Sequence, residues 1–239
     1  MLLSLRKCFV ASALALAASQ ASAIVCVPPA TASDCSPPVG NVVFDLNNQL
    51  LPHTYTQYTV SFIAANANTA LSFQFREDPA FFFLDDIVLL HGTSGPNLVV
   101  NGGFENGTFI DPVAGTPQPL GWTYLNLFNA GASGRVATNL PHSGTSNYYD
   151  GAVGAYDGIT QGIATTVGDL YTLSFWLTDN SSQLLGSQVN GPNGSGIDLL
   201  VYAGLLPTIV PRPVPEPSAL ALLALGIAGV LVARRRQQK

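Results

Sequence analysis

The sequence predicts an all-β domain between two apolar ends. Three stretches alternate apolar and polar residues with a period of two, which is typical of strands with one buried face: residues 55–64, 69–76 and 170–178. The region between the ends is rich in Gly, Asn, Thr and Ser, and no amphipathic helix of normal length interrupts it. Its length is sufficient for one good-sized β-domain, so the expected fold is a β-sandwich over residues 41–206.

The first strand segment covers residues 41–91. Its predicted strands are residues 42–46, 55–64, 69–76 and 81–90. Alternation places Phe73 and Phe75 on the buried face of the third strand. The fourth is a nearly continuous apolar run that only Asp85 and Asp86 interrupt, and the Gly/Ser/Pro cluster at residues 91–96 ends the segment in a turn.

The second strand segment covers residues 97–206. Its predicted strands are residues 135–138, 158–164, 170–178 and 196–203. In the third of these, Leu173 and Phe175 face the core and Trp176 faces the other way. Residues 140–158 show little periodicity and are predicted as loop. Residues 207–217 contain five prolines and form an extended stem.

The N-terminus predicts export. Residues 1–23 combine a positive start at Arg6 and Lys7, an apolar run and an Ala21-Ser22-Ala23 cleavage site, which together are typical of a helical signal peptide read by the Sec translocon. The β-branched Val25 before the next cysteine argues against a lipoprotein, since a lipobox needs a small residue there.

Two cysteines remain after cleavage, Cys26 and Cys35, in a Pro-rich lead of residues 24–40. An even pair in an oxidising compartment predicts a disulfide that closes this short loop. A metal pair is the alternative, but no histidine or further cysteine lies near in sequence to complete such a site.

The C-terminus combines three features in one order. A Pro215-Glu216-Pro217 motif precedes the uncharged residues 218–233, and a basic stub follows. A 16-residue helix is about 24 Å long, short for a comfortable transmembrane span. The stub ends transfer and stays in the cytoplasm, and its arginines are Arg234, Arg235 and Arg236.

This tail, residues 214–239, resembles the PEP-CTERM sorting signal of Gram-negative bacteria. The resemblance implies recognition by an exosortase, a membrane enzyme, in species that make extracellular polysaccharide. The C-terminal transmembrane helix of residues 218–239 is then a transient inner-membrane anchor before delivery to the envelope, surface or matrix. An ordinary single-span anchor with a Pro-rich stem is the alternative reading.

Net charge excludes one class of partner. Residues 24–217 contain three arginines and all 14 acidic residues, a net charge of −11, and they contain no lysine. Such a surface repels phosphate backbones, so no nucleic-acid partner is expected.

Several segments resemble the galactose-binding-like jelly rolls of carbohydrate-binding modules. NLVVNGGFE (residues 97–105) with Gly121-Trp122 resembles their opening, and residues 161–177 resemble their middle strands. Residues 55–90 resemble their closing strands, yet they come first here. Either two truncated domains follow one another, or a single jelly-roll β-sandwich is circularly permuted. The second reading is preferred, because the first segment alone is too short to cover a core.

The resemblance also implies a structural calcium site. In these modules an ion lies where the opening segment meets the closing strand, which selects Glu105, Asp86 and Asp85 as oxygen ligands. No cofactor is otherwise expected. The alternative is that one aspartate faces solvent and Glu105 only caps a turn.

A polysaccharide site needs aromatic faces beside polar groups. The loop residues Tyr148, Tyr149 and Tyr156 are the candidates, while Trp122 is expected in the core. No nucleophile elbow, paired histidines or phosphate loop is present, so an enzyme is not expected. The sequence therefore predicts an exported polysaccharide-binding protein. A structural or adhesive matrix protein without a specific ligand is the alternative, and a glycan-active enzyme comes third.

Overall fold

The computed structural model describes residues 38–47, 51–77, 81–126, 130–153, 155–179 and 198–208. These belong to one compact unit, residues 24–211. The signal peptide, Cys26, Cys35, the sorting motif and the stop-transfer arginines lie outside the described residues, so the predictions made for them stay predictions. In the part of the chain that is described, no helix has the length and apolar character needed to cross a membrane.

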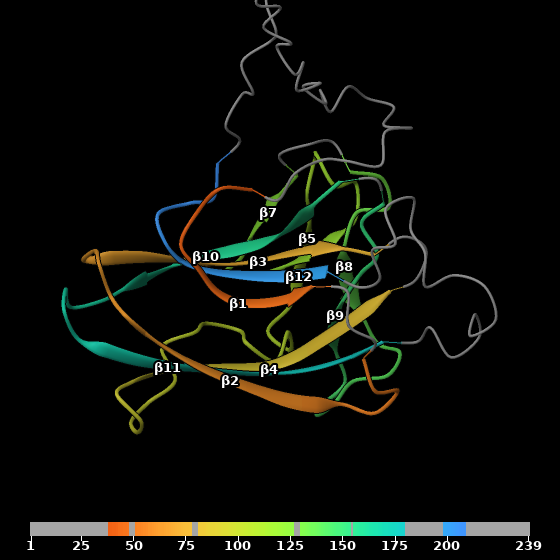
Figure 1. The fold of residues 1–239 in the computed structure, drawn as a ribbon. Helices are drawn as coiled ribbons and strands as arrows, with labels where there is room; N and C mark the ends of the chain where they lie inside the picture. Colours follow the sequence, from red (N-terminus) through yellow and green to blue (C-terminus); the bar gives the residue numbers. More distant parts are fainter. Residues whose placement is uncertain are drawn as a thin grey trace, which may run out of the picture. The chain divides into compact units, whose positions relative to one another are not determined.

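The described residues form an all-β structure. Its strands are β1 (Val42–Asn47), β2 (Thr56–Ile63), β3 (Asn68–Arg76), β4 (Phe82–His91), β5 (Thr108–Ile110), β6 (Pro117–Pro119), β7 (Thr123–Leu125), β8 (Arg135–Ala137), β9 (Asn147–Asp150), β10 (Asp157–Ala164), β11 (Leu170–Asp179) and β12 (Asp198–Gly204). Two five-stranded antiparallel sheets, in the orders β1-β12-β3-β10-β7 and β2-β11-β4-β9-β8, form the two layers of a sandwich (Figure 1). The strands β5 and β6 form a separate pair.

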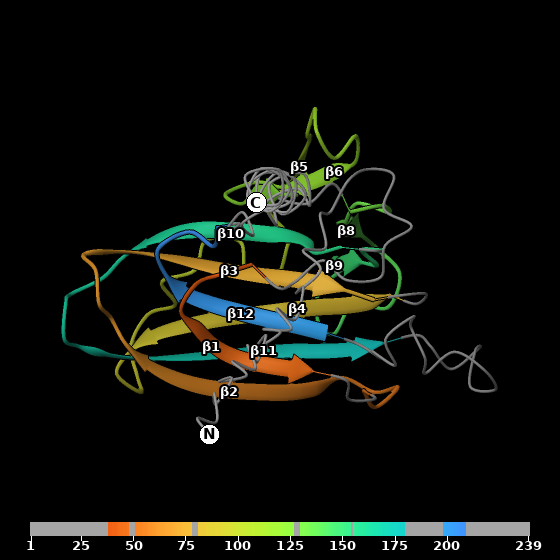
Figure 2. The ribbon, with the colours of Figure 1, turned by 45° about the horizontal axis from the view of Figure 1, so that its top comes forward.

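Strands from the two sequence segments interleave in both sheets. In one sheet β3 lies between β12 and β10, and in the other β4 lies between β11 and β9 (Figure 2). Each connection from β1 through β4 crosses between the sheets, and so does each connection from β9 through β12. Neither segment therefore forms a sheet of its own, and together they build one sandwich.

The core lies between the two sheets and draws on both segments. Phe73 and Phe75 of β3 are fully buried with Leu173 and Phe175 of β11, and all four belong to one apolar cluster. The rings of Phe73 and Phe175 meet edge to face with centroids 5.3 Å apart. Trp122 is also buried there, as expected. Period-two alternation thus identified the inward residues of β3 and β11 correctly.

The segment that follows β4 turns back along it. The Asn97 side chain accepts hydrogen bonds from the backbone N–H groups of Leu89 and Val99, and it donates one to the Ile87 carbonyl. A Cβ added to Gly102 would lie 2.1 Å from that same carbonyl oxygen, so only glycine permits the close approach. The turn at residues 91–96 therefore joins β4 to a segment that is packed against it.

The structure differs from the sequence prediction between residues 140 and 158. This stretch was predicted as loop, but it contains β9 and the start of β10. Glycines and buried aspartates obscure its periodicity, because polar residues here point into the protein instead of toward solvent. Strand β6 contains two prolines and still pairs with β5.

Candidate functional site: a groove on one sheet

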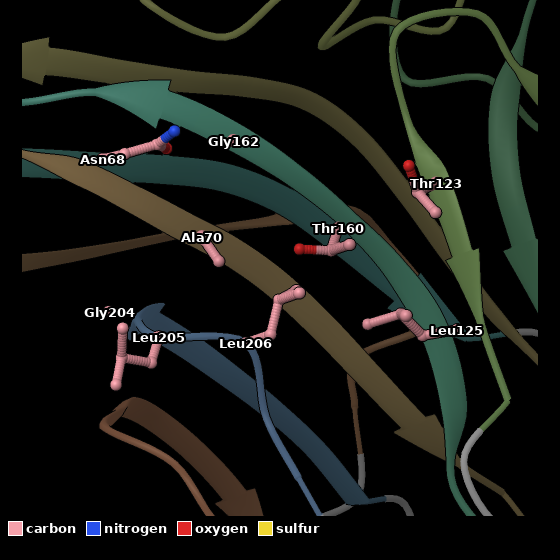
Figure 3. Close-up of a pocket in the computed structure, with 9 residues that line it drawn as sticks. All are labelled: Asn68, Ala70, Thr123, Leu125, Thr160, Gly162, Gly204, Leu205 and Leu206. Carbon is pink, nitrogen blue, oxygen red and sulfur yellow. The ribbon is translucent and has the colours of Figure 1, made fainter.

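A groove with a volume of about 440 Å³ lies on the outer face of the sheet that contains β3 and β10 (Figure 3). It is lined by Asn68, Ala70, Thr123, Leu125, Thr160, Gly162, Gly204, Leu205 and Leu206. These residues come from β3, β7, β10, the end of β12 and the two residues that follow it, Leu205 and Leu206. The groove thus crosses four neighbouring strands and is open to a ligand from outside.

Small residues form the floor of the groove. Gly162 pairs with Ala70, and Ala70 pairs with Gly204, so the three lie in one row across β10, β3 and β12. Residues two positions apart along a strand point to the same face of the sheet. Because the residues in this row have small side chains or none, the surface of the sheet is hollowed there. Leu125 and Leu206 extend into the groove from its two sides (Figure 3).

The lining is uncharged. None of its nine residues has a titratable side chain, so the groove offers no acid, base or nucleophile with a lowered pKa. Thr160 donates or accepts a hydrogen bond with Ser72 at 2.6 Å, while Asn68 and Thr123 are exposed. Leu205 and Leu206 are 72% and 52% exposed. The groove therefore combines free amide and hydroxyl groups with apolar walls, which suits a neutral ligand.

Sequence reasoning missed this groove. Its signal was present as Gly162 and Gly204 inside or at the end of strand patterns, where glycine often marks a close approach of another molecule. The three strands that carry Gly162, Ala70 and Gly204 are distant in sequence, so only the strand pairing shows that these residues form one row.

The structure brings the three predicted calcium ligands to one loop, residues 142–146. Asp85 accepts hydrogen bonds from the backbone N–H groups of His142 and Ser143, and Asp86 contacts the His142 ring at 2.7 Å. Glu105 accepts hydrogen bonds from the N–H groups of Thr145 and Ser146 at 2.6 and 2.7 Å. The opening segment and β4 therefore do meet at this loop, as the jelly-roll resemblance implied.

The carboxylate oxygens of this cluster are engaged by hydrogen bonds in this arrangement. Every carboxylate oxygen of Asp85, Asp86 and Glu105 already accepts a hydrogen bond, including Asp85 Oδ1 from the Asp86 N–H. Across the described residues, no three His, Cys, Asp or Glu side chains are grouped to hold a metal ion. Calcium at Asp85, Asp86 and Glu105 stays a prediction.

Electrostatics differ between these carboxylates. Burial raises the pKa of Asp85 to about 6, although N–H donors from Ser143, Asp86 and His142 act in the opposite direction. The hydroxyl and N–H of Thr145 lower the pKa of Glu105. Asp86 occupies the left-handed backbone region with φ at 49°, where the β4–β11 pairing is irregular.

Two aromatic rings pack against His142 of the same loop. The His142 ring lies parallel to Trp176 of β11 at 3.9 Å, and the Tyr55 ring meets it edge-on at 5.1 Å. Tyr55 also donates a hydrogen bond to the Leu140 carbonyl. Trp176 faces away from the core, as predicted, but the loop covers it. The loop is held from both sides, by carboxylates and by rings.

The predicted polysaccharide-binding tyrosines lie in different environments. Tyr148 is fully buried in the core and Tyr156 is 2% exposed, its hydroxyl donating a hydrogen bond to Asp198. Neither offers a ring face to a sugar, which corrects that assignment. Tyr149 is half-buried, stacks on Phe81 at 4.5 Å and lies 5.3 Å from the Arg135 guanidinium carbon. Tyr148 and Tyr149 differ in exposure because successive residues of β9 point to opposite faces of the sheet.

A buried pair of carboxyl groups lies at one end of the sandwich. Asp150 of β9 and Asp157 of β10 are fully buried, and their side chains are within hydrogen-bonding reach of each other. Asp150 Oδ2 and Asp157 Oδ1 are buried without a hydrogen-bond partner. Tyr124 donates to Asp157 Oδ2 at 2.5 Å. Burial raises the pKa of Asp157 to about 6, and burial together with the Asp157 charge raises the pKa of Asp150 well above its usual range.

Comparison with known proteins identifies the tail. No curated protein and no solved structure matches this chain. Residues 213–236 match the model of the PEP-CTERM protein-sorting motif, in agreement with the resemblance found at residues 214–239. The chain therefore carries the PEP-CTERM protein-sorting motif, which implies export and membrane-anchored sorting by an exosortase-type enzyme in Gram-negative bacteria.

Proposed function

We propose that this exported protein binds a neutral extracellular polysaccharide in the groove on the β3–β10 sheet, without acting on it as an enzyme. The observation that carries the proposal is an uncharged groove of about 440 Å³ on an open sheet face. Exposed Asn68 and Thr123 supply hydrogen-bonding groups for sugar hydroxyls, and Leu205 and Leu206 supply apolar contact for sugar CH groups.

Charge favours a neutral ligand over an anionic one. Residues 24–217 carry a net charge of −11, so an acidic polysaccharide is repelled at long range. Nothing in the groove counters that repulsion, because its lining has no Arg or Lys. The sorting tail supports the proposal in part, since it implies export and membrane-anchored sorting, and a ligand outside the cell is compatible with that route.

We also infer that the sandwich is a jelly roll. If the short strands β5 to β8 are left out, the two sheets have the orders β1-β12-β3-β10 and β2-β11-β4-β9. When these eight strands are numbered along the chain, the orders are 1-8-3-6 and 2-7-4-5, which is the strand order of a jelly roll. Moving four strands from one end of such a chain to the other leaves this pattern unchanged. Circular permutation, with the old ends joined through residues 91–96, is therefore compatible with the strand order. Fold likeness alone does not identify the ligand.

The test is calorimetric titration of the protein with neutral and uronic-acid polysaccharides. We expect heat of binding with the neutral chain only. Ala70→Phe places a ring on the groove floor and should lower affinity by at least about tenfold, or about 1.4 kcal/mol. Thr172→Phe adds the same ring to the outer face of the other sheet and should bind like the parent.

The results also separate the alternatives. Unchanged binding by Ala70→Phe would place the ligand elsewhere. No binding to any member of a glycan array would favour a structural or adhesive matrix protein. Release of sugar ends from the polysaccharide would show a glycan-active enzyme instead.

A further inference from the structure

The lateral edges of the two sheets differ in how well they resist pairing with another strand. The edge strands β7 and β8 are only three residues long, and β1 has a register shift after Val42 and an exposed Asp45. These are devices that keep sheet edges from pairing. The edge strand β2 has none of them: Thr56–Ile63 (TQYTVSFI) is eight residues long and uncharged, without Pro or Gly. It pairs with β11 in unbroken register, and in the described residues it has no second strand partner.

The core is least covered along this same margin. Six hydrophobic residues pack against the main core while only partly buried, and four of them, Val43, Phe44, Tyr58 and Val60, lie on β1 and β2. These two strands run along one margin of the sandwich (Figure 2). Phe44 and Tyr58 meet with ring centroids 5.2 Å apart. Apolar side chains therefore remain accessible beside a strand edge that no other described strand pairs with.

The outer face of β2 adds no obstacle. Gln57, Thr59 and Ser61 are exposed there and uncharged. The domain as a whole is strongly acidic, so two copies repel each other over most of their surfaces. An uncharged strip with a free edge is where two such copies approach at the lowest electrostatic cost.

We propose that β2 pairs with β2 of a second copy of this chain, antiparallel and centred on Thr59. In this register Thr59 faces its own copy, Gln57 faces Ser61, and Tyr58 faces Val60. Tyr58 and Val60 point inward, so each aromatic ring packs on a β-branched side chain of the partner and the open margin of both cores is covered. The interface is two-fold and self-complementary, as closed dimers require. Two five-stranded sheets become one continuous sheet of ten.

Cysteine crosslinking of the exported full-length chain tests this register. Directly opposed residues in antiparallel strands have Cα atoms about 4.5–5.5 Å apart, within the range of about 4.4–6.8 Å that a disulfide spans. Thr59→Cys should therefore give a disulfide-linked species of twofold apparent mass on a non-reducing gel. Ser174→Cys is the matched control, because Ser174 lies beside Thr59 on the same face. It is three strand spacings, about 14 Å, from its copy and should stay monomeric.

A second pair of variants keeps the test independent of one position. Gln57→Cys with Ser61→Cys should also give the twofold species, because each faces the other across the axis. The two are about 14 Å apart within one strand, too far to bond internally. Adding Thr59→Lys to this double variant opposes like charges at the axis and should abolish the twofold species.

The parent chain run beside these variants shows any band due to Cys26 and Cys35. A Thr59→Cys chain that remains monomeric overturns the proposal. If its thiol is then also protected from maleimide, the edge is covered by another occupant, such as residues 24–37 of the same chain. Crosslinking by Ser174→Cys equal to that of Thr59→Cys would mean random collision and would overturn it as well.

Discussion

The buried carboxyl pair predicts that the domain loses stability as pH rises. Asp150 and Asp157 are within hydrogen-bonding reach, and the oxygen of each that lacks another donor is buried. We expect one shared proton to satisfy both oxygens, because two full charges would repel each other without solvent to screen them. Asp150→Asn replaces that proton by an amide N–H of nearly the same shape, so the contact is kept at any pH.

The sign and size follow from proton binding. An unfolded aspartate ionises near pH 3.9, while the folded protein holds the proton of Asp150 to a much higher pH. The folded state therefore binds more protons than the unfolded state, and stability falls as pH rises through this window. For one site the slope is about 1.4 kcal/mol per pH unit. The Asp150→Asn variant lacks the contribution of Asp150 to that slope, so its stability should fall less steeply with rising pH than that of the parent.

Urea unfolding of residues 24–211 at pH 5, 6, 7 and 8 measures the difference, with fluorescence of the two tryptophans, Trp122 and Trp176, as the probe. Asp45→Asn, at an exposed position on β1, is the control for removing a negative charge; because Asp45 acts on Asp198, it should change the pH profile slightly and far less than Asp150→Asn does. Parallel profiles for Asp150→Asn and the parent would refute the shared proton. A variant less stable than the parent at pH 8 would refute it too.

Three further predictions concern the rest of the chain. Gly134→Ala would place its Cβ 2.2 Å from a carboxylate oxygen of Asp150, so we expect a loss of about 1–3 kcal/mol in urea unfolding. Gly131→Ala meets nothing closer than 3.9 Å and should cost less than about 0.5 kcal/mol, and equal losses would contradict this reading. If calcium binds at Glu105, EGTA should lower the Tm, and an unchanged Tm argues against it. Deletion of residues 214–239 should leave a soluble folded domain that is exported but not sorted, and an unfolded product would show that the core needs the tail.

Strand prediction succeeded where one face of a strand is buried and the other is polar. In residues 69–76 and 170–178 the alternation is regular, so it predicts Phe73 and Phe175 in the core, where their rings are in contact. It failed around Tyr148 and Tyr156, because β9 and β10 carry buried polar groups and glycines. An alternating sequence pattern predicts burial only where the buried residues are apolar and the exposed ones are polar. In this domain aspartates are among the most buried side chains.

Some features of the candidate sites could likewise be predicted from the sequence, and others could not. Proximity of Glu105 to Asp85 followed from a resemblance, and both contact one loop in the structure. The groove and the Asp150–Asp157 pair had no local signal, because each brings together strands that are far apart in sequence.

By itself the sequence determined the all-β class, the inward residues of the regular strands, the acidic charge and the sorting motif at residues 213–236. Each of these properties follows from the periodicity of a single strand, the composition of the chain or a short motif, without knowledge of which strands pair. Only the tertiary structure decided that the two segments share one core, that Tyr148 lies inside it, and that Gly162, Ala70 and Gly204 line up across three strands. Strand pairing is non-local: hydrogen bonds along a sheet edge form between any two strands whose faces match. Which strands meet, and so where a groove opens, is therefore selected by burial of the whole core.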